Sequence, residues 1–152
     1  MSTVTSGGSR VQETGDSRVE MFTLEKRFAS EIIEHARAEA PNECCGLLAG
    51  KNGTILQMYR CDSAEKSPHR YYVDPKDQLR VMRELDQKGW ELLGIYHSHT
   101  HTEAYPSKTD VELAFYPETL YVIVSLEKAS EPVIRGFRIS NGEITEEEVM
   151  IA

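Results

Sequence analysis

A nearly continuous apolar run, Leu120 to Leu126 (LYVIVSL), most constrains the fold of this chain. Apolar runs of about four to eight residues that are rich in β-branched side chains are typical of a central strand buried on both faces. The run is also far shorter than the ~20 residues that a membrane-spanning helix needs. It therefore predicts a sheet at the centre of the fold.

Apolar periodicity predicts a helix near the N-terminus. Phe28, Ile32 and Ala36 recur at helical spacing, which indicates a helix from Thr23, as its N-cap, to about Ala40.

A second helix is predicted after Asp74, an N-cap residue followed by proline, with Leu79, Met82 and Leu85 as its buried stripe. Turn residues and apolar patterning place a third helix from about residue 107, and strands at 45–50, 55–60, 70–73, 90–98, 120–126, 133–139 and 144–151. This order predicts an α/β fold: a single domain with a mixed, largely antiparallel sheet flanked by helices.

The length of 152 residues fits one domain. Residues 1–20 are rich in Ser, Thr and Gly and show no apolar periodicity, so we expect a disordered tail there and a folded domain over 21–152.

The charge balance excludes several classes of partner. The chain has 17 Lys and Arg against 25 Asp and Glu, a net charge of −8, which argues against binding to nucleic acid or to an anionic membrane surface. The N-terminus lacks the apolar core of a signal peptide, and three Cys do not make a disulfide framework. We therefore expect a cytoplasmic protein.

The residues best suited to bind a metal ion lie in the stretch GIYHSHTHTEAYPSKTD, residues 94–110. Residues i and i+2 of a strand point to the same face, so His97 and His99 can present two imidazoles to one metal ion. Asp110 lies eleven residues after His99, and a loop of that length lets the chain reverse and add a carboxylate. Two imidazoles and one carboxylate leave the fourth tetrahedral position for water, the arrangement of a catalytic zinc site.

Other interpretations of these residues stay open at this point. Ser107 and Asp110 could simply cap the helix that begins there. His101 continues the alternation, so a site built from three histidines without Asp110 is conceivable. Cys44 and Cys45 could bind metal but are more typical of small, buried strand residues.

These residues resemble the JAMM (MPN+) metalloprotease family, and in particular its bacterial branch. The resemblance rests on Glu43, on His97-Ser98-His99, and on Ser107 and Asp110, and it extends from about residue 21 to the C-terminus. The segments CGLLAG and GIYHSH are also similar to the family. Thr100 departs from the pattern, since many members have proline there, but this leaves the ligands unchanged.

The resemblance implies a JAMM/MPN-type fold, which is cytidine-deaminase-like, and a role for each residue. His97, His99 and Asp110 would hold one Zn²⁺ with a catalytic water, Glu43 would be the general base and then acid, and Ser107 would stabilise the oxyanion. Glu43 has no cationic neighbours in the sequence and precedes an apolar strand, which favours a raised pKa.

The resemblance also implies a substrate: the C-terminal tail of a ubiquitin-like sulfur-carrier protein, cut after Gly-Gly to release cysteine during cysteine biosynthesis. Trimming of extra residues from a related carrier, hydrolysis of small amide metabolites and a non-catalytic scaffold are the alternatives. We expect no nucleic-acid or membrane partner and allow for a homodimer.

Several further residues have weaker signals. Trp90 and the pair Tyr71-Tyr72 are more typical of a core than of a substrate platform. Four cationic residues could form a docking patch for an acidic carrier: Arg70, Arg80, Arg83 and Lys108.

Overall fold

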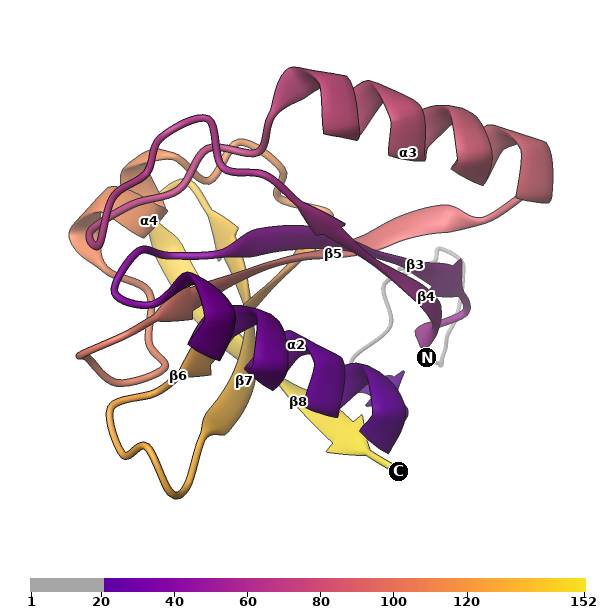
Figure 1. The fold of residues 1–152 in the computed structure, drawn as a ribbon. Helices are drawn as coiled ribbons and strands as arrows, with labels where there is room; N and C mark the ends of the chain where they lie inside the picture. The colour runs from indigo at the N-terminus through magenta and orange to yellow at the C-terminus, as the bar shows by residue number, and fades with distance from the viewer. Residues whose placement is uncertain (1–20) are drawn as a thin grey trace.

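Seven strands close into one barrel in the computed structural model, which describes residues 21–152 (Figure 1). The elements are, in chain order, β2 (Met21–Leu24), α2 (Lys26–Glu39), β3 (Cys45–Lys51), β4 (Thr54–Cys61), α3 (Pro75–Lys88), β5 (Glu91–His99), α4 (Lys108–Glu112), β6 (Leu120–Ser125), β7 (Val133–Ser140) and β8 (Glu143–Ile151). The tail predicted over residues 1–20 lies outside the described residues.

The strand directions are mixed, and the predicted fold class is confirmed. Around the barrel the strands follow the order β2-β4-β3-β5-β6-β7-β8. Strand β3 pairs antiparallel with both β4 and β5, and β7 pairs antiparallel with β6 and β8. The parallel pairs are β5 with β6, and β2 with both β8 and β4. The short strand β2 therefore closes the barrel.

The helix predicted to begin at Thr23 begins later. Residues Met21–Leu24 form β2, and the helix starts at Lys26 with Glu25 as its N-cap. The reason is that Phe22 and Leu24 alternate into the core, where they are 2% and 0% exposed, while their backbone pairs with β8.

Two other expectations were wrong. Residues 70–73 form no strand, and their only ladder contact is an isolated bridge between Ser63 and Val73. Of the stripe predicted on α3, Leu85 is buried and Met82 packs against the core, as expected, but Leu79 is 54% exposed and Val81 is buried instead. Because Val81 and Leu85 are four residues apart, they lie on one face of the helix, and this face differs from the predicted one by the exchange of Leu79 for Val81.

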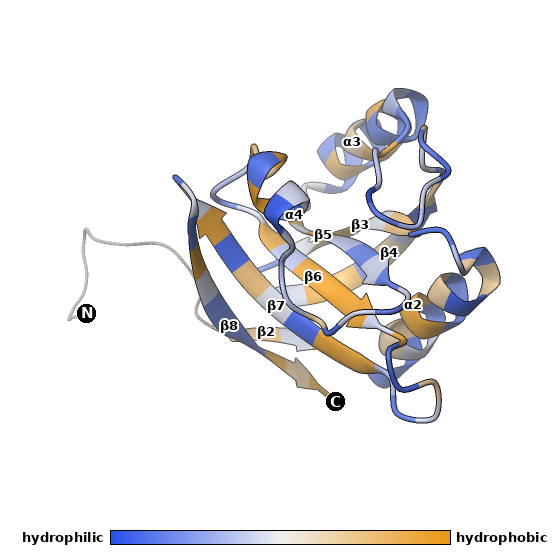
Figure 2. Cartoon of the chain, turned by 90° about the vertical axis from the view of Figure 1, so that its left-hand side faces the viewer, coloured by the Kyte–Doolittle hydropathy of each residue, from blue (hydrophilic) through white to orange (hydrophobic). Residues whose placement is uncertain are grey.

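Strand β6 confirms the central strand predicted from the apolar run, since all six of its residues are buried. Val122 and Val124 belong to a core cluster that includes Phe28 and Ile32 of α2. Ile123, one residue between them, belongs to a second cluster, which includes Val81 and Leu85 of α3. Helices α2 and α3 thus lie on opposite sides of β3, β4 and β5 (Figure 1), and β6 is among the most hydrophobic strands (Figure 2). No helix among residues 21–152 is both long and apolar enough to cross a bilayer.

Candidate metal centre

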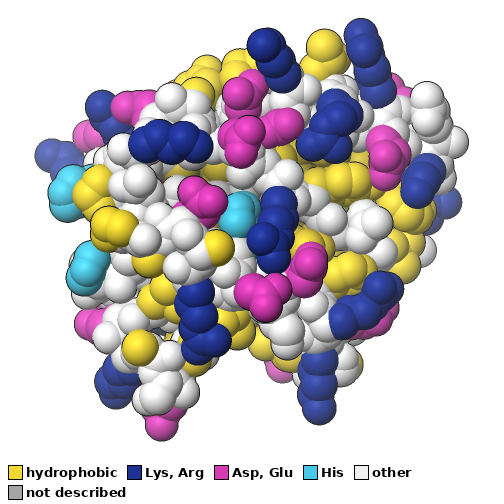
Figure 3. Space-filling model, in the orientation of Figure 1, with side chains coloured by type: hydrophobic (Ala, Val, Ile, Leu, Met, Phe, Trp, Pro, Cys, Tyr) yellow, Lys and Arg dark blue, Asp and Glu magenta, His cyan; other side chains and the backbone are white. Residues whose placement is uncertain are grey.

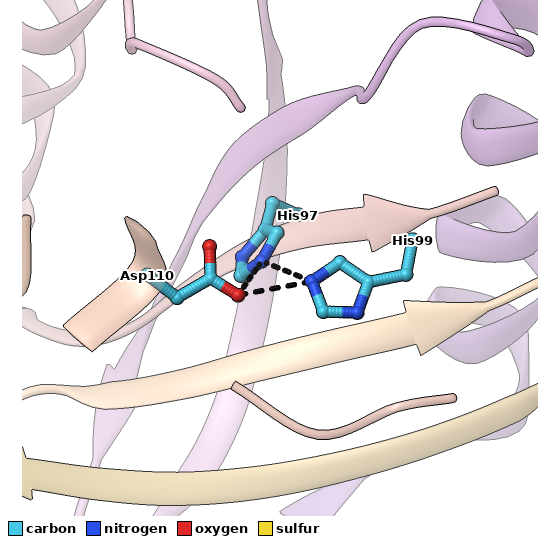
Figure 4. A group of neighbouring side chains, drawn as sticks. All are labelled: His97, His99 and Asp110. Atoms are coloured by element: carbon cyan, nitrogen blue, oxygen red, sulfur yellow. Dashed lines mark hydrogen bonds and ion pairs between the residues drawn. The ribbon is translucent and has the colours of Figure 1, made fainter. Parts of the chain in front are cut away.

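Three buried side chains converge where β5 ends and α4 begins. His97 and His99 project from β5 toward Asp110 on α4 (Figure 4). Nε2 of His97 lies 3.3 Å from Nε2 of His99, and Oδ2 of Asp110 lies 3.2 Å from the first and 2.9 Å from the second. The three residues are 1%, 4% and 7% exposed, so these polar atoms meet in a site that is largely shielded from solvent.

The spacing of these atoms suits a tetrahedral metal ion. Two ligands about 2.0–2.1 Å from a tetrahedral zinc ion lie roughly 3.3–3.4 Å from each other. The observed separations of 2.9 to 3.3 Å are close to that value. Among the described residues, these are the three whose ligand atoms group as a candidate metal site. The side chains fit a zinc ion with one coordination position left over.

Asp110 is a capping residue as well as a candidate ligand. The amide of Asp110 donates to Oγ of Ser107 at 3.0 Å, and the amide of Ser107 donates to Oδ2 of Asp110 at 2.9 Å, which forms a complete capping box on α4. Burial would raise the pKa of Asp110, but the electrostatic interaction with His97 and the hydrogen bonds from His97, His99 and the Ser107 amide outweigh it and hold the pKa well below its usual value. The carboxylate is therefore ionised and fixed in place.

A backbone carbonyl orients the second imidazole. Nδ1 of His99 donates to the carbonyl oxygen of Glu103 at 2.8 Å, which leaves Nε2 to face His97 and Asp110. Burial lowers the pKa of His99, but the hydrogen bonds to Asp110 and Glu103 raise it overall.

Glu43 is buried beside this group although it lies far away in the sequence. Its amide donates to the carbonyl of Ser67 at 2.8 Å, and the next residue, Cys44, is bonded to Ser98 between the two histidines: its amide donates to Oγ at 2.8 Å. The Glu43 side chain is 5% exposed, and its Oε1 has no hydrogen-bond partner among residues 21–152. Burial, followed by the charge of Asp110, raises its pKa to about 8, although His99 opposes the shift.

The structure does not bring the alternative ligands into this group. His101 is exposed, and its Nδ1 lies 2.9 Å from Oγ1 of Thr100. Cys44 belongs to the core cluster on the α2 side and Cys45 to the one on the α3 side, since consecutive strand residues face opposite ways.

The cationic residues expected to form a docking patch are interspersed with acids. Arg70 pairs with Glu65 at 3.1 Å and Arg80 with Asp77 at 3.3 Å. In the view of Figure 3, Lys and Arg side chains stand at the top of the molecule over α3, with Asp and Glu between them. No uniform basic surface is visible on that face.

One contact of Tyr71 was not predicted from the sequence. Trp90 and Tyr71 pack against the core on the α3 side, as expected, whereas Tyr72 is 54% exposed. The ring of Tyr71 also stacks on His97. No sequence signal could have revealed this contact, because Tyr71 lies in an irregular segment without periodicity.

Comparison with known proteins gives concordant matches. The family model described as prokaryotic homologs of the JAB domain matches residues 25–140. The chain is 38% identical over 135 residues to the CysO-cysteine peptidase of Mycobacterium tuberculosis, covering 88% of this chain and 92% of the relative. It is 32% identical over 117 residues to a probable TtuB-protein conjugate cleaving protease of Thermus thermophilus, covering 74% of each. A solution structure from Desulfitobacterium hafniense superposes with a TM-score of 0.80 at 37% identity, covering 87% of this chain and 93% of the other.

The metal ligands can be tested by zinc content after reconstitution. Asp110→Asn should bind markedly less zinc than the wild type, because it loses the anionic ligand while its amide oxygen can still cap α4. His101→Ala, the matched control, should retain full zinc. Zinc loss in His101→Ala together with retention in Asp110→Asn would overturn the ligand assignment.

The buried carboxyl of Glu43 should make the metal-free protein less stable as pH rises. The folded-state pKa is raised, to about 8, so folding favours the protonated form and stability is lost from about pH 4.5 up through pH 8. Glu43→Gln removes this cost. It should stabilise the metal-free protein at pH 8 by about 4 kcal/mol, given about 1.4 kcal/mol per pKa unit, and hardly at all at pH 4.5. Urea unfolding at both pH values measures this effect. An equal difference in the free energy of unfolding between Glu43→Gln and the wild type at both pH values would refute the raised pKa of Glu43.

Proposed function

Since the chain belongs to the prokaryotic JAB family of JAMM/MPN metallopeptidases, we propose that it is a zinc enzyme that hydrolyses the bond after the C-terminal Gly-Gly of a ubiquitin-like sulfur-carrier protein. One observation carries the catalytic part of the proposal. A buried carboxyl group with a raised pKa and an unpaired oxygen, that of Glu43, lies beside three convergent ligand atoms.

The residues divide the chemistry of peptide hydrolysis among them. Zinc bound by His97, His99 and Asp110 would supply a nucleophile at neutral pH by lowering the pKa of water. Glu43 would accept the proton of that water and then deliver it to the departing amine. Oγ of Ser107 accepts the amide hydrogen of Asp110, which leaves its own hydroxyl proton free to stabilise the oxyanion.

An apolar pocket beside the site supports a peptide substrate. It has a volume of about 140 Å³, and Tyr71 lines it while also stacking on His97, so the pocket adjoins the metal site. Its rim includes Phe115 and Tyr72, which are 69% and 54% exposed. An open rim suits an extended chain with an apolar side chain near the scissile bond. A small amide metabolite would need a more enclosed site, so we rank a metabolite hydrolase lower.

The relatives support a protein tail as the substrate. One is named a CysO-cysteine peptidase and another a probable TtuB-protein conjugate cleaving protease. We infer by analogy that a ubiquitin-like carrier is the partner and that cysteine is the residue removed. Trimming of longer extensions from a related carrier is the second candidate. A non-catalytic scaffold would not need the complete set of Glu43, Ser107 and metal ligands. We also infer a cytoplasmic location, which Cys44, Cys45 and Cys61 support as free thiols.

Mass spectrometry of carrier proteins ending in Gly-Gly-Cys tests the activity. The zinc-loaded wild type should remove the terminal cysteine, and Glu43→Ala should keep its zinc but lose at least about 100-fold in kcat, because the reaction would lose its proposed base. A carrier with a longer extension after Gly-Gly, assayed in parallel, separates cysteine release from trimming. No cleavage of several carriers by zinc-loaded protein would exclude the proposal.

The pocket predicts an effect on substrate binding. Phe115→Ser should raise KM for the carrier about fivefold, since loss of apolar burial worth about 1 kcal/mol changes an equilibrium by that factor, with zinc content unchanged. Ile151→Ser, at an exposed apolar residue of β8, is the matched control and should leave KM unchanged. Equal effects of both substitutions would argue against the pocket as a subsite.

A further inference from the structure

The two candidate histidine ligands are held by different means. Nδ1 of His99 is bonded to the carbonyl of Glu103 at 2.8 Å. Nδ1 of His97 is buried and has no hydrogen-bond partner among residues 21–152. Metal-binding histidines usually gain their orientation from a hydrogen bond at the second nitrogen, so something else must set the plane of the His97 ring.

An aromatic ring lies against His97. The ring of Tyr71 is 4.4 Å from the imidazole, centroid to centroid, and the two planes differ by 20°, which is a stacked arrangement. On the sheet, His97 pairs with Cys45 on one side and Ile123 on the other; the Cys45 thiol is bonded to the carbonyl of Asp62 and Ile123 is apolar, so neither side chain is bonded to the imidazole.

Two hydrogen bonds at the backbone of Tyr72 hold the segment that carries Tyr71 in place. The amide of Tyr72 donates to Oγ of Ser63 at 3.0 Å, and the carbonyl of Tyr72 accepts from the amide of Ala64 at 2.7 Å. The backbone next to Tyr71 is therefore hydrogen-bonded to residues 63–64, and this keeps the Tyr71 ring in a fixed position beside the imidazole.

We propose that Tyr71 is a positioning residue for the metal centre: by stacking on His97 it holds the imidazole plane so that Nε2 points at His99 and Asp110. The inference rests on the proposed metal site but not on the identity of the substrate. Tyr71 replaces, for His97, the hydrogen bond that Glu103 provides for His99.

The stack should favour the metal-bound state over the metal-free one. A divalent cation on Nε2 withdraws electrons from the imidazole, and an electron-poor ring is attracted more strongly to the face of an aromatic ring. Stronger stacking in the bound state raises metal affinity. The aromatic face supplies this effect, so phenylalanine should serve at position 71 whereas a non-aromatic side chain should not.

Three variants separate the possible roles of this position. Tyr71→Met keeps bulk without an aromatic plane, Tyr71→Phe keeps the plane, and Tyr72→Leu is a control in the same segment at an exposed side chain. We expect Tyr71→Met to weaken zinc binding about tenfold, as measured by competition with a chelator, and to change the visible spectrum of the cobalt-substituted protein. Tyr71→Phe and Tyr72→Leu should stay within about twofold of the wild type in zinc affinity.

Zinc affinity decides the question, because Tyr71 also lines the apolar pocket and can affect KM. A lower melting temperature in Tyr71→Met with unchanged zinc affinity and cobalt spectrum would mean a structural role and would overturn the proposal. A raised KM with unchanged zinc affinity would mean a substrate contact and would overturn it too. If Tyr71→Met does not fold, the Tyr71→Phe variant decides. A zinc affinity of Tyr71→Phe well below that of the wild type would refute the proposal. A zinc affinity equal to that of the wild type, with an unaltered cobalt spectrum, would support it. These measurements use no carrier, so they stand even if the proposed substrate is wrong.

Discussion

The pairing of β3 with β5 is the contact on which the site depends. The strands register Cys45 opposite His97, and just beyond them Cys44 and Ser98 exchange two hydrogen bonds: the Cys44 amide donates to the Ser98 hydroxyl, and the Ser98 amide donates to the Cys44 carbonyl. Glu43 directly precedes Cys44 and is thereby placed beside candidate ligands that follow it by more than fifty residues. Because side chains alternate along a strand, a register slip of one residue would turn both histidines away from Asp110.

The parts of the fold that local patterns govern could be predicted from the sequence. The apolar run of β6, the helix after Asp74 and the Ser107–Asp110 cap each depend on residues close together in the chain. Strand β2 could not be predicted, because four residues acquire their conformation by pairing with β8 at the other end of the domain. The contact between Tyr71 and His97 was likewise out of reach, since irregular backbone brings it about.

The environment of Glu43 is costly for folding and, in the proposed mechanism, useful for catalysis for the same reason. Removing a carboxylate from water without a hydrogen-bond partner for one oxygen disfavours its charged form, which is why burial is the main cause of its raised pKa. An exposed glutamate would be a weak base at neutral pH, whereas one with a pKa near the working pH can both accept and return a proton. A bound cation would favour the charged form of Glu43, so its attraction to the carboxylate would offset part of the cost of burying that charge.

In Asp110 the capping role and the proposed role as a metal ligand depend on the same carboxylate. Helix α4 has only five residues, too few to be stable by itself, and the capping box with Ser107 satisfies amides at its start. The same Oδ2 that accepts from the Ser107 amide faces both imidazoles. Folding of this short helix therefore brings the third candidate ligand into position. An ion bound to that oxygen would in turn stabilise the start of the helix. The same capping box also holds Ser107, the residue proposed to stabilise the oxyanion.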